Sequence, residues 1–270
     1  MSTPVTNAQD PAMPSEPYGR AYRTWKGWAE SSFGELSAVQ RKYFLAELRR
    51  TGLDLPRPLD VLEIGFGNGS FLAFARQQGW RISGTEMSQE LVNSACAKGF
   101  DARHDLEFAS FPEESFDLVV AFDVLEHIEQ HDLAAFVARV LRVLRTGGRF
   151  LARFPNGDSP FSCVFQNGDP THRSWIGSFR AHSLAAETGC EVAFLGGETK
   201  LLFAGDLKST LKRLITIPAG FLMNAVLCAA VFDHTGFTLL SPNLVVVFKR
   251  PNLPAPATIA SPDRSRNELA

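Results

Sequence analysis

The sequence is poor in several features that would each point to a class of protein. Its four cysteines, Cys96, Cys163, Cys190 and Cys228, stand far apart without any Cys-x-x-Cys pair. This argues against zinc ribbons and disulfide frameworks. Basic residues are not in excess, because the formal net charge is -2, whereas proteins that bind nucleic acid usually carry a net basic domain. We therefore expect reduced thiols and no nucleic-acid partner.

The first residues also lack a basic segment followed by an apolar run, so we expect no secretion signal and a cytoplasmic location, with contact at the inner membrane surface as an alternative. Residues 1–18 and 251–270 are rich in proline and polar residues and are predicted to be disordered. Between them the chain is not poor in apolar residues. Hydrophobic residues make up 45% of its 270 positions, enough for the core of one α/β domain with an insertion.

The most informative segment present is an apolar stretch that ends in alternate glycines, V-L-E-I-G-F-G-N-G at positions 61–69. Glycine at every second position suits a tight turn or the close approach of a ligand. Glu86 ends the next apolar segment, about twenty residues on, where a carboxylate can bind two ribose hydroxyls. The spacing Gly-x-Gly-x-Gly differs from that of pyrophosphate-binding loops, and no Lys-Ser/Thr pair follows it, which argues against a P-loop.

The rest of the chain alternates predicted strands and helices. We expect strands near 59–64, 81–86, 100–104, 116–122, 148–154 and 243–249, and helices near 69–79, 88–98 and 130–144. Such alternation predicts a parallel sheet covered on both faces, with ligands at the carboxyl ends of the strands. Aromatic and apolar residues at helical spacing in 22–50 predict one or two N-terminal helices, which either cover the cofactor or pack on the sheet edge.

Together these motifs resemble the class I S-adenosylmethionine-dependent methyltransferases. Besides the glycine loop and Glu86, the resemblance includes H-D-L at 104–106, the strand and loop at 116–127, and L-R-T-G-G-R-F at 144–150. It implies an α/β, Rossmann-like, doubly wound, mostly parallel seven-stranded sheet. The implied organisation is an N-terminal helical cap at 19–57 and a methyltransferase domain at 58–250, with an apolar helical insertion at 199–242.

The resemblance also implies S-adenosylmethionine as the cofactor. The residues that it assigns to cofactor binding are Glu63, Gly65, Phe66, Gly67, Asn68, Gly69, Glu86, Met87, Asp105, Leu106, Asp123 and Val124. Of these, Glu86 is expected at the ribose and Asp105 at the adenine amino group.

Chemistry becomes plausible in the loop after the fourth strand. Asp123, Glu126 and His127, joined by His172, could bind a divalent metal that orients an acceptor's hydroxyls. The element resembles the acid-x-x-Glu-His of ubiquinone-pathway O-methyltransferases and small-RNA 2'-O-methyltransferases, with Asp123 where those have Glu. Alternatively His127 or His172 acts as a general base without metal, or the L-E-H sequence only shapes the loop.

The acceptor has to be read from 155–189 and 199–242, outside the cofactor motifs. The segment P-N-G-D-S-P-F followed by G-D-P-T-H resembles methyltransferases of bacterial surface-polysaccharide and other glycan pathways, although such a segment also fits a plain turn cluster. We expect methyl transfer to a hydroxyl of a small molecule, first a sugar of a glycan or glycolipid. The alternatives are a lipid or quinone at the membrane surface, and a non-catalytic partner protein. The polar and aromatic residues of this segment are Phe154, Asn156, Asp158, Ser159, Phe161, Phe165, Asn167, Asp169, His172 and Trp175.

An almost uncharged run at 215–232 follows Lys208, Lys212 and Arg213. Its length approaches that of a membrane span, but Pro218 and the return of a strand at 243–249 argue against a crossing. We expect a capping helix or a contact between two copies, or else a helix on a membrane surface.

Overall fold

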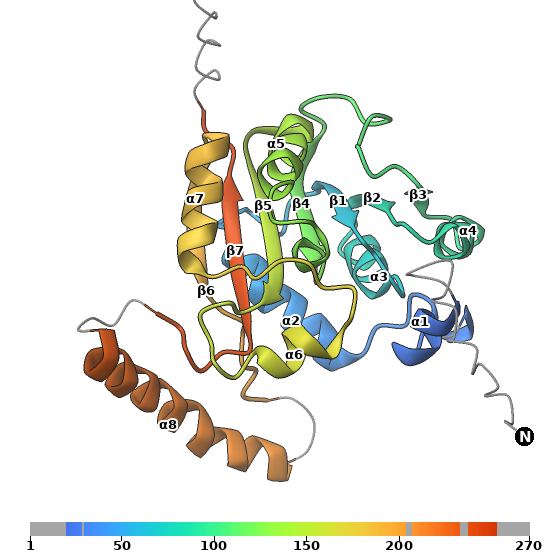
Figure 1. The fold of residues 1–270 in the computed structure, drawn as a ribbon. Coiled ribbons are helices and arrows are strands. Elements are labelled where there is room, and N and C mark those ends of the chain that lie inside the picture. The colour runs from blue at the N-terminus through green and yellow to red at the C-terminus, as the bar shows by residue number, and fades with distance from the viewer. Residues whose placement is uncertain (1–19, 29, 204–206, 233–236, 253–270) are drawn as a thin grey trace, which may run out of the picture.

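The computed structural model describes residues 20–28, 30–203, 207–232 and 237–252. Their strands form one seven-stranded sheet in the order β3-β2-β1-β4-β5-β7-β6 (Figure 1). β7 runs antiparallel to both of its neighbours, and the other pairs are parallel, so the predicted mostly parallel sheet is confirmed. The predicted disorder of 1–18 and of most of 251–270 lies outside the described residues. The strands are β1 Asp60–Ile64, β2 Arg81–Thr85, β3 Asp101–Arg103, β4 Phe116–Phe122, β5 Leu144–Pro155, β6 Glu191–Gly197 and β7 Asn243–Lys249.

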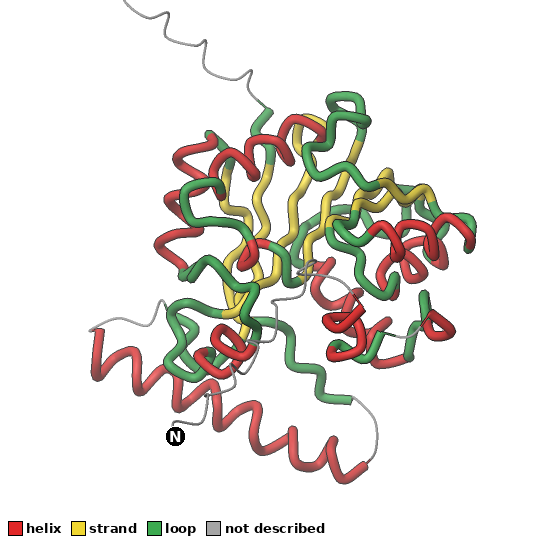
Figure 2. The backbone as a smooth tube through the Cα atoms, turned by 45° about the vertical axis from the view of Figure 1, so that its right-hand side comes forward, coloured by secondary structure: helices red, strands yellow, loops and turns green. Residues whose placement is uncertain are grey.

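Helices lie on both faces of the sheet, as Figure 2 shows. α5 and α7 contribute to the core on one face, and α2 and α3 to the core on the other. The N-terminal segment, where a helical cap was expected, contains α1, η1 and α2. The helices are α1 Arg20–Trp25, η1 Glu30–Ser32, α2 Ala38–Arg49, α3 Ser70–Gln77, α4 Gln89–Ala97, η2 Leu125–His127, α5 Leu133–Val143, α6 Cys163–Gly168, α7 Ser178–Thr188 and α8 Leu207–Phe232.

The central strand β4 shows why this sequence forms a buried parallel sheet. Successive side chains of a strand point to opposite faces, and here both faces are covered. Leu118 and Val120 pack into the α2–α3 side, while Val119 and Ala121 pack into the α5–α7 side. A strand buried on both faces reads as a continuous apolar run, and β4 begins and ends at the predicted residues.

β5 differs from its prediction because it begins at Leu144 rather than near 148. The expected helix at 130–144 ends at Val143 instead. Leu144 is extended, with φ -71° and ψ 143°, and it pairs with Phe116 of β4. Its side chain is fully buried in the core, so packing on the sheet, rather than helical spacing, decides its conformation.

The carboxyl ends of the parallel strands share one edge of the sheet, and α8 lies at this edge too. Pro155 at the end of β5 pairs with Asn243 at the start of β7. Gly197 at the end of β6 pairs with Leu244. α8 connects β6 to β7, so the chain leaves and re-enters the sheet at the edge where parallel sheets bind ligands (Figure 1).

Candidate active site

A cavity of about 540 Å³ opens at the carboxyl ends of β1, β2 and β4, a size within the usual range of small-molecule sites. Three sequence motifs meet there: the glycine loop after β1, the acid after β2 and the loop after β4. The residues around it are Tyr22, Trp28, Ile64, Gly65, Thr85, Glu86, Met87, Ser88, Leu91, Leu106, Glu107, Phe108, Asp123, Val124, His127, Ile128, Glu129, Asp132, Phe136 and Arg139.

The three glycines of the loop do different work. Gly65 lines the cavity with φ +66°, and a Cβ there would lie 2.7 Å from a methyl group of Val124. At Gly67 a Cβ would meet the Trp28 ring at 2.8 Å, and at Gly69 it would meet Phe33 at 2.5 Å. The loop is therefore tight because N-terminal aromatic rings pack on it, and Gly65 alone of the three faces the cavity. Phe66 is buried beneath the loop against the same Phe33 ring.

Glu86 is held rigidly in the cavity wall. Its Oε2 accepts a hydrogen bond from the Gly67 amide at 3.0 Å, and its Oε1 accepts from the amides of Met87 and Ser88 at 2.8 and 3.2 Å. Burial raises the pKa of this carboxyl above its usual value. A buried acid with fixed orientation at the end of β2 suits recognition of ribose hydroxyls.

Glu63 lies below the loop as a second buried carboxyl group. Burial, followed by the nearby charge of Glu86, raises its pKa well above the usual value. Its Oε2 has no hydrogen-bond partner among the residues that the structure describes. Glu63 does not line the cavity, so it supports the glycine loop from below.

The structure places the Asp105 carboxylate in a local turn. It accepts hydrogen bonds from the amide and the hydroxyl of Ser110 at 2.7 and 2.6 Å, and from the Ala109 amide at 3.2 Å. The cavity wall nearby is formed by Leu106, Glu107 and Phe108. Met87 and Leu106, both partly exposed apolar side chains, stand on this wall where a flat base could lie.

Asp123 also lines the cavity, but its carboxylate is engaged elsewhere. It forms an ion pair with Arg153 of β5, and this guanidinium also donates to the hydroxyl of Tyr43 at 3.0 Å. The backbone of Asp123 has φ +58°, a conformation that is rare for residues other than glycine and often marks functional loops. Asn68 turns away in a similar manner, because its side-chain amide donates to the Ser32 carbonyl.

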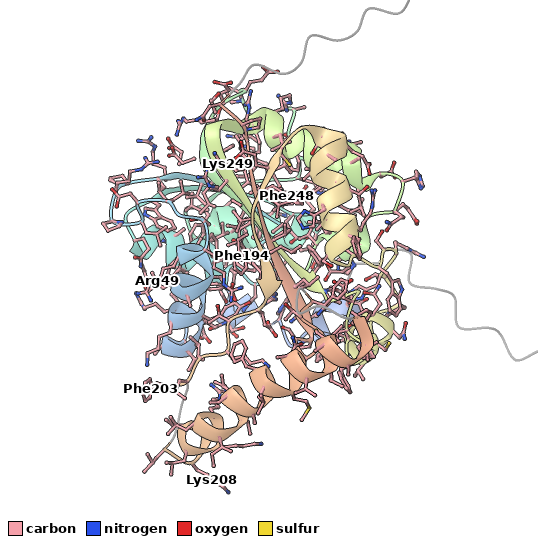
Figure 3. All side chains as sticks on the ribbon, turned by 90° about the vertical axis from the view of Figure 1, so that its left-hand side faces the viewer. Arg49, Phe194, Phe203, Lys208, Phe248 and Lys249 are labelled. Atoms are coloured by element: carbon pink, nitrogen blue, oxygen red, sulfur yellow. The ribbon has the colours of Figure 1, made fainter. Side chains whose placement is uncertain are left out.

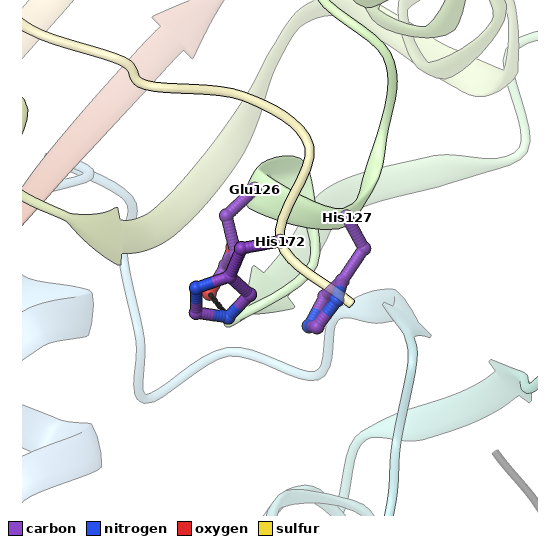
Figure 4. A group of neighbouring side chains, drawn as sticks. All are labelled: Glu126, His127 and His172. Atoms are coloured by element: carbon purple, nitrogen blue, oxygen red, sulfur yellow. Dashed lines mark ion pairs between the residues drawn. The ribbon is translucent and has the colours of Figure 1, made fainter. Parts of the chain in front are cut away.

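Glu126, His127 and His172 come together at the end of this loop (Figure 4). One ligand atom from each lies within 4.8 Å of the others, and the two imidazole centroids are 4.8 Å apart. Glu126 and His127 belong to η2, and His172 comes from the chain between α6 and α7. Its neighbour Arg173 donates its amide to the Glu126 carbonyl at 2.7 Å, which holds the two segments together. Asp123 is not part of this cluster.

Hydrogen bonds indicate the tautomer of both imidazoles. The Thr171 hydroxyl donates to Asp169, so towards His127 Nδ1, 3.0 Å away, it can only accept. His172 Nδ1 lies 3.0 Å from the Gln166 carbonyl oxygen, which is also only an acceptor. We infer that, in the neutral form of each imidazole, Nδ1 carries the proton and Nε2 the lone pair.

Burial favours the uncharged forms of His127 and Glu126. It lowers the pKa of His127 to about 4, with His172 as the next cause. Burial, and then Asp123, raises the pKa of Glu126 well above the usual value. Glu126 Oε2 has no hydrogen-bond partner within the described ranges. With Glu126 deprotonated, its orphaned oxygen and the Nε2 atoms of the two imidazoles form a donor set that fits a divalent cation.

The turn after β5 uses its polar side chains for structure. Asn156 Nδ2 donates to the carbonyls of Thr238 and Ser241, and the Ser159 hydroxyl donates to the Leu239 carbonyl. Asp158 accepts from the Ser178 amide at the start of α7. The aromatic Phe161, Phe165 and Trp175 are exposed. Of the polar residues considered for a sugar, His172 belongs to the cluster and Asp169 lies beside it.

Residues that sequence motifs did not single out complete the site. Tyr22 and Trp28 form one wall, and the Tyr22 hydroxyl donates to Asp169 at 3.2 Å. Lys26 pairs with the same carboxylate at 3.3 Å. The spacing of aromatic residues in 22–50 predicted helices there, but it could not show which aromatic rings reach the cavity. Arg139 on α5 also lines the cavity and forms an ion pair with Glu107 at 3.1 Å.

Comparisons with known proteins agree with this geometry. The model of the family described as "Methyltransferase domain" matches residues 37–193. A "Probable S-adenosylmethionine-dependent methyltransferase" of Mycolicibacterium smegmatis is 38% identical over 100 residues, which are 36% of this chain and 38% of the relative. A ubiquinone biosynthesis O-methyltransferase of Methylobacterium sp. is 31% identical over 107 residues, 36% of this chain and 42% of the relative. The matches thus span about two fifths of each curated relative.

Among solved structures, a SAM-dependent methyltransferase from Archaeoglobus fulgidus has the same fold, with a TM-score of 0.57 at 18% identity, covering 84% of this chain and 99% of that one. The family match, the sheet order and the acid and glycine positions agree, and they imply S-adenosylmethionine as the cofactor. This chain is a member of the S-adenosylmethionine-dependent methyltransferase domain family.

Proposed function

We propose that this protein transfers a methyl group from S-adenosylmethionine to a hydroxyl of a small molecule. The observation that carries the proposal is the Glu126–His127–His172 cluster, which stands beside the cavity and in which burial lowers the pKa of His127 to about 4. When bound, the cofactor supplies a methyl group on a sulfonium, which is already a good leaving group. The chain's own tasks are therefore to bind, to orient, to exclude water and to take up a proton.

The cofactor side of the cavity is defined by Glu86, Gly65 and the apolar wall at Met87 and Leu106. Glu86 would hold the ribose hydroxyls, and the apolar wall would cover the base. Tyr22 and Trp28 cover the loop from the N-terminal side and keep water from the reacting atoms.

The acceptor's hydroxyl has to lose its proton around the time of transfer. His127 lines the cavity and can receive it, since a pKa of about 4 leaves its imidazole neutral at neutral pH, although the same low pKa makes it a weak base. The cluster can instead hold a divalent cation that binds the hydroxyl and lowers its pKa. In both cases Glu126, His127 and His172 carry the acceptor chemistry.

We propose a lipid-borne hydroxyl as the acceptor. A glycolipid sugar fits the expectation from the turn after β5, although Asn156, Asp158 and Ser159 in that turn bond the protein itself. A quinone-type phenol is the second candidate. It is favoured by the apolar cavity residues Val124, Ile128 and Phe136 and by the similarity to a ubiquinone biosynthesis O-methyltransferase.

Calorimetric titration with S-adenosylmethionine and S-adenosylhomocysteine is the first test. We expect binding of both, weakened about 100-fold in Glu86→Ala, which loses hydrogen bonds to charged groups, and unchanged in the matched control Glu191→Ala, an exposed acid at the start of β6. If the wild type binds neither ligand, the hypothesis that the chain is an enzyme is rejected, and a non-catalytic partner protein is supported.

Mass spectrometry should then detect the gain of one methyl group on glycolipids or on polyprenylated phenols, assayed with and without a chelator. Chelator-sensitive activity restored by a divalent cation supports the metal role, and chelator-insensitive activity rejects it. Full activity in both His127→Ala and His172→Ala rejects the general base.

A further inference from the structure

The long helix α8 presents its polar side to the protein and its apolar side outwards. Asn224 donates its amide to the Phe237 carbonyl at 2.9 Å and accepts from the Leu240 amide at 3.1 Å. Arg213 donates to the Leu201 carbonyl at 2.7 Å. A helix on the surface of a water-soluble protein shows the reverse pattern, with its apolar stripe on the core.

The outward side is apolar over nearly the whole helix. Ile215, Phe221 and Leu222 are 73%, 72% and 69% exposed, and Cys228 is the one buried residue of the 26 in α8. At about 100° per residue, the outward residues other than Val231 cover roughly 200° of the helix circumference. Figure 3 shows α8 running along the end of the body, with Lys208 at the end of the helix that lies farther from it. The other exposed large apolar residues are Leu207, Leu211, Leu214, Met223, Val226, Val231 and Phe232.

α8 is long and apolar enough to cross a membrane, but its connections oppose a crossing. Before it, the Thr199 amide donates to Glu47 of α2. After it, Leu239 is held by Ser159, and Asn224 in the middle of the helix is bonded to the segment that follows. The described segments before and after α8 and the centre of the helix are therefore bonded to the same folded body, which suits a helix lying flat in an interface.

The charges on α8 distinguish a lipid surface from a second copy of the chain. Lys208 and Lys212 lie one turn apart and point outwards at the start of the helix, and α8 contains no acidic residue. Two copies of α8 packed together would bring lysines against apolar residues without any carboxylate from the helix. A paired helix would also cover a stripe of only about 100°, whereas anionic headgroups and acyl chains can cover all of it.

Other apolar side chains continue this surface at the same edge of the sheet. Phe161, just before α6, is 61% exposed, and Val164 on α6 is 76% exposed. Phe179 on α7 is 74% exposed. Phe179 contacts Phe237, which contacts Phe232 at the end of α8. The apolar face therefore extends from α8 towards the segments that carry His172.

We propose that α8 lies in the surface of an anionic lipid bilayer, with its apolar side among the acyl chains and with Lys208 and Lys212 at the headgroups. α6 and the start of α7 meet the same surface. The cavity edge of the sheet then faces the membrane. The proposal does not depend on the reaction, so it can fail while the proposed function stands.

Co-sedimentation of the full chain with vesicles tests it, using phosphatidylcholine alone and phosphatidylcholine mixed with phosphatidylglycerol. We expect binding to the mixed vesicles at least about 10-fold tighter than to the neutral ones. The double variant Phe221→Asp/Leu222→Asp should reduce it by at least about 10-fold. The matched control is Cys96→Asp, an exposed position on α4 at the far side of the sheet. It should bind as the wild type does.

The double variant Lys208→Ser/Lys212→Ser should remove most of the preference for anionic vesicles, and its control Arg49→Ser on α2 should keep it. Circular dichroism and thermal unfolding establish that every variant is folded. Failure of the wild type to bind either vesicle would overturn the proposal. So would a dimer in sedimentation velocity that the Asp variants dissociate, because that result would make a second copy the occupant.

Discussion

The His127–His172 cluster and α8 lie at the same edge of one sheet, and they break the usual rule of burial in opposite directions. The cluster takes titratable groups out of water: Glu126 is 1% exposed and carries an orphaned oxygen. α8 places phenylalanine and leucine side chains in contact with solvent. Each region is costly in the isolated chain. The cluster therefore suits the binding of a polar ligand, and α8 suits contact with an apolar surface.

The first test of this comparison is whether chemistry resides in the cluster alone. We expect His127→Ala and His172→Ala to lower kcat by about 100- to 10,000-fold, because each removes an imidazole from the acceptor side. The affinity for S-adenosylmethionine should change little. His182→Ala, an exposed histidine on α7, is the control and should keep full kcat. Steady-state assays with a soluble acceptor measure all three, and equal losses in the control would contradict the assignment.

The second prediction concerns the cost of the buried imidazole. His127 has a pKa of about 4 in the folded chain and 6.5 when unfolded, so the unfolded state binds the proton first. Its contribution to stability is complete above pH 6.5 and is lost as the pH falls towards 4, by up to about 3 kcal/mol. Urea unfolding at pH 7.5 and 4.5 should show this loss in the wild type relative to His127→Gln. Parallel pH profiles would contradict it.

The third prediction concerns how tightly the aromatic rings pack against the glycine loop. Gly69→Ala should destabilise the fold by about 2 kcal/mol or more, because φ is +71° and the new Cβ would meet Phe33 at 2.5 Å. Gly99→Ala is the control, since its φ is +75° but nothing lies within 4 Å. It should show the smaller cost of backbone strain alone. Equal unfolding midpoints for the two variants would show that Phe33 moves aside freely.

Replacing a glycine by alanine on α8 should change the free energy of unfolding in the opposite direction. At Gly220 the nearest atom to a new Cβ is Lys200 Nζ, 4.0 Å away, and alanine favours a helix over glycine by roughly 1 kcal/mol. Gly220→Ala should therefore stabilise the chain by up to about 1 kcal/mol in thermal unfolding. A loss of stability would mean that α8 packs more closely on the body than its open neighbours indicate.

The smallest effect is expected on the outward face of α8 without lipid. Leu222→Ser should change the free energy of unfolding by no more than about 0.5 kcal/mol, because the side chain is 69% exposed. A core leucine such as Leu72, fully buried in α3, should cost several-fold more when changed to serine. A large effect at Leu222 in lipid-free buffer would reveal a protein partner on α8.

Much of the fold could be predicted because its signals are local. β4 is buried on both faces, so its apolar run marks its own ends, and the distance from the glycine loop to Glu86 is set by one helix and one strand. The partners of individual carboxylates could not be predicted. Asp105 turns to Ser110, and Asp123 finds Arg153 on a neighbouring strand. Each outcome depends on side-chain contacts that no spacing encodes.

The orientation of α8 relative to the rest of the protein could also not be predicted from the sequence. Its polar residues recur at helical spacing, but spacing alone does not tell which side meets the body. The hydrogen bonds of Asn224 to Phe237 and Leu240 decide it. Similarly, the alternate glycines predicted a close approach without saying that the Trp28 and Phe33 rings make it.

The way β6 and β7 meet has a consequence for how such a chain can diversify. Gly197 pairs with Leu244, and the Glu198 amide donates to the Asn243 carbonyl at 3.2 Å, so the two strands close on each other just where the chain departs for α8. The excursion between them can be shortened, exchanged or lost while the strand register is kept. With α8 as the membrane-binding helix that we propose, the methyltransferase fold and this helix can therefore evolve separately.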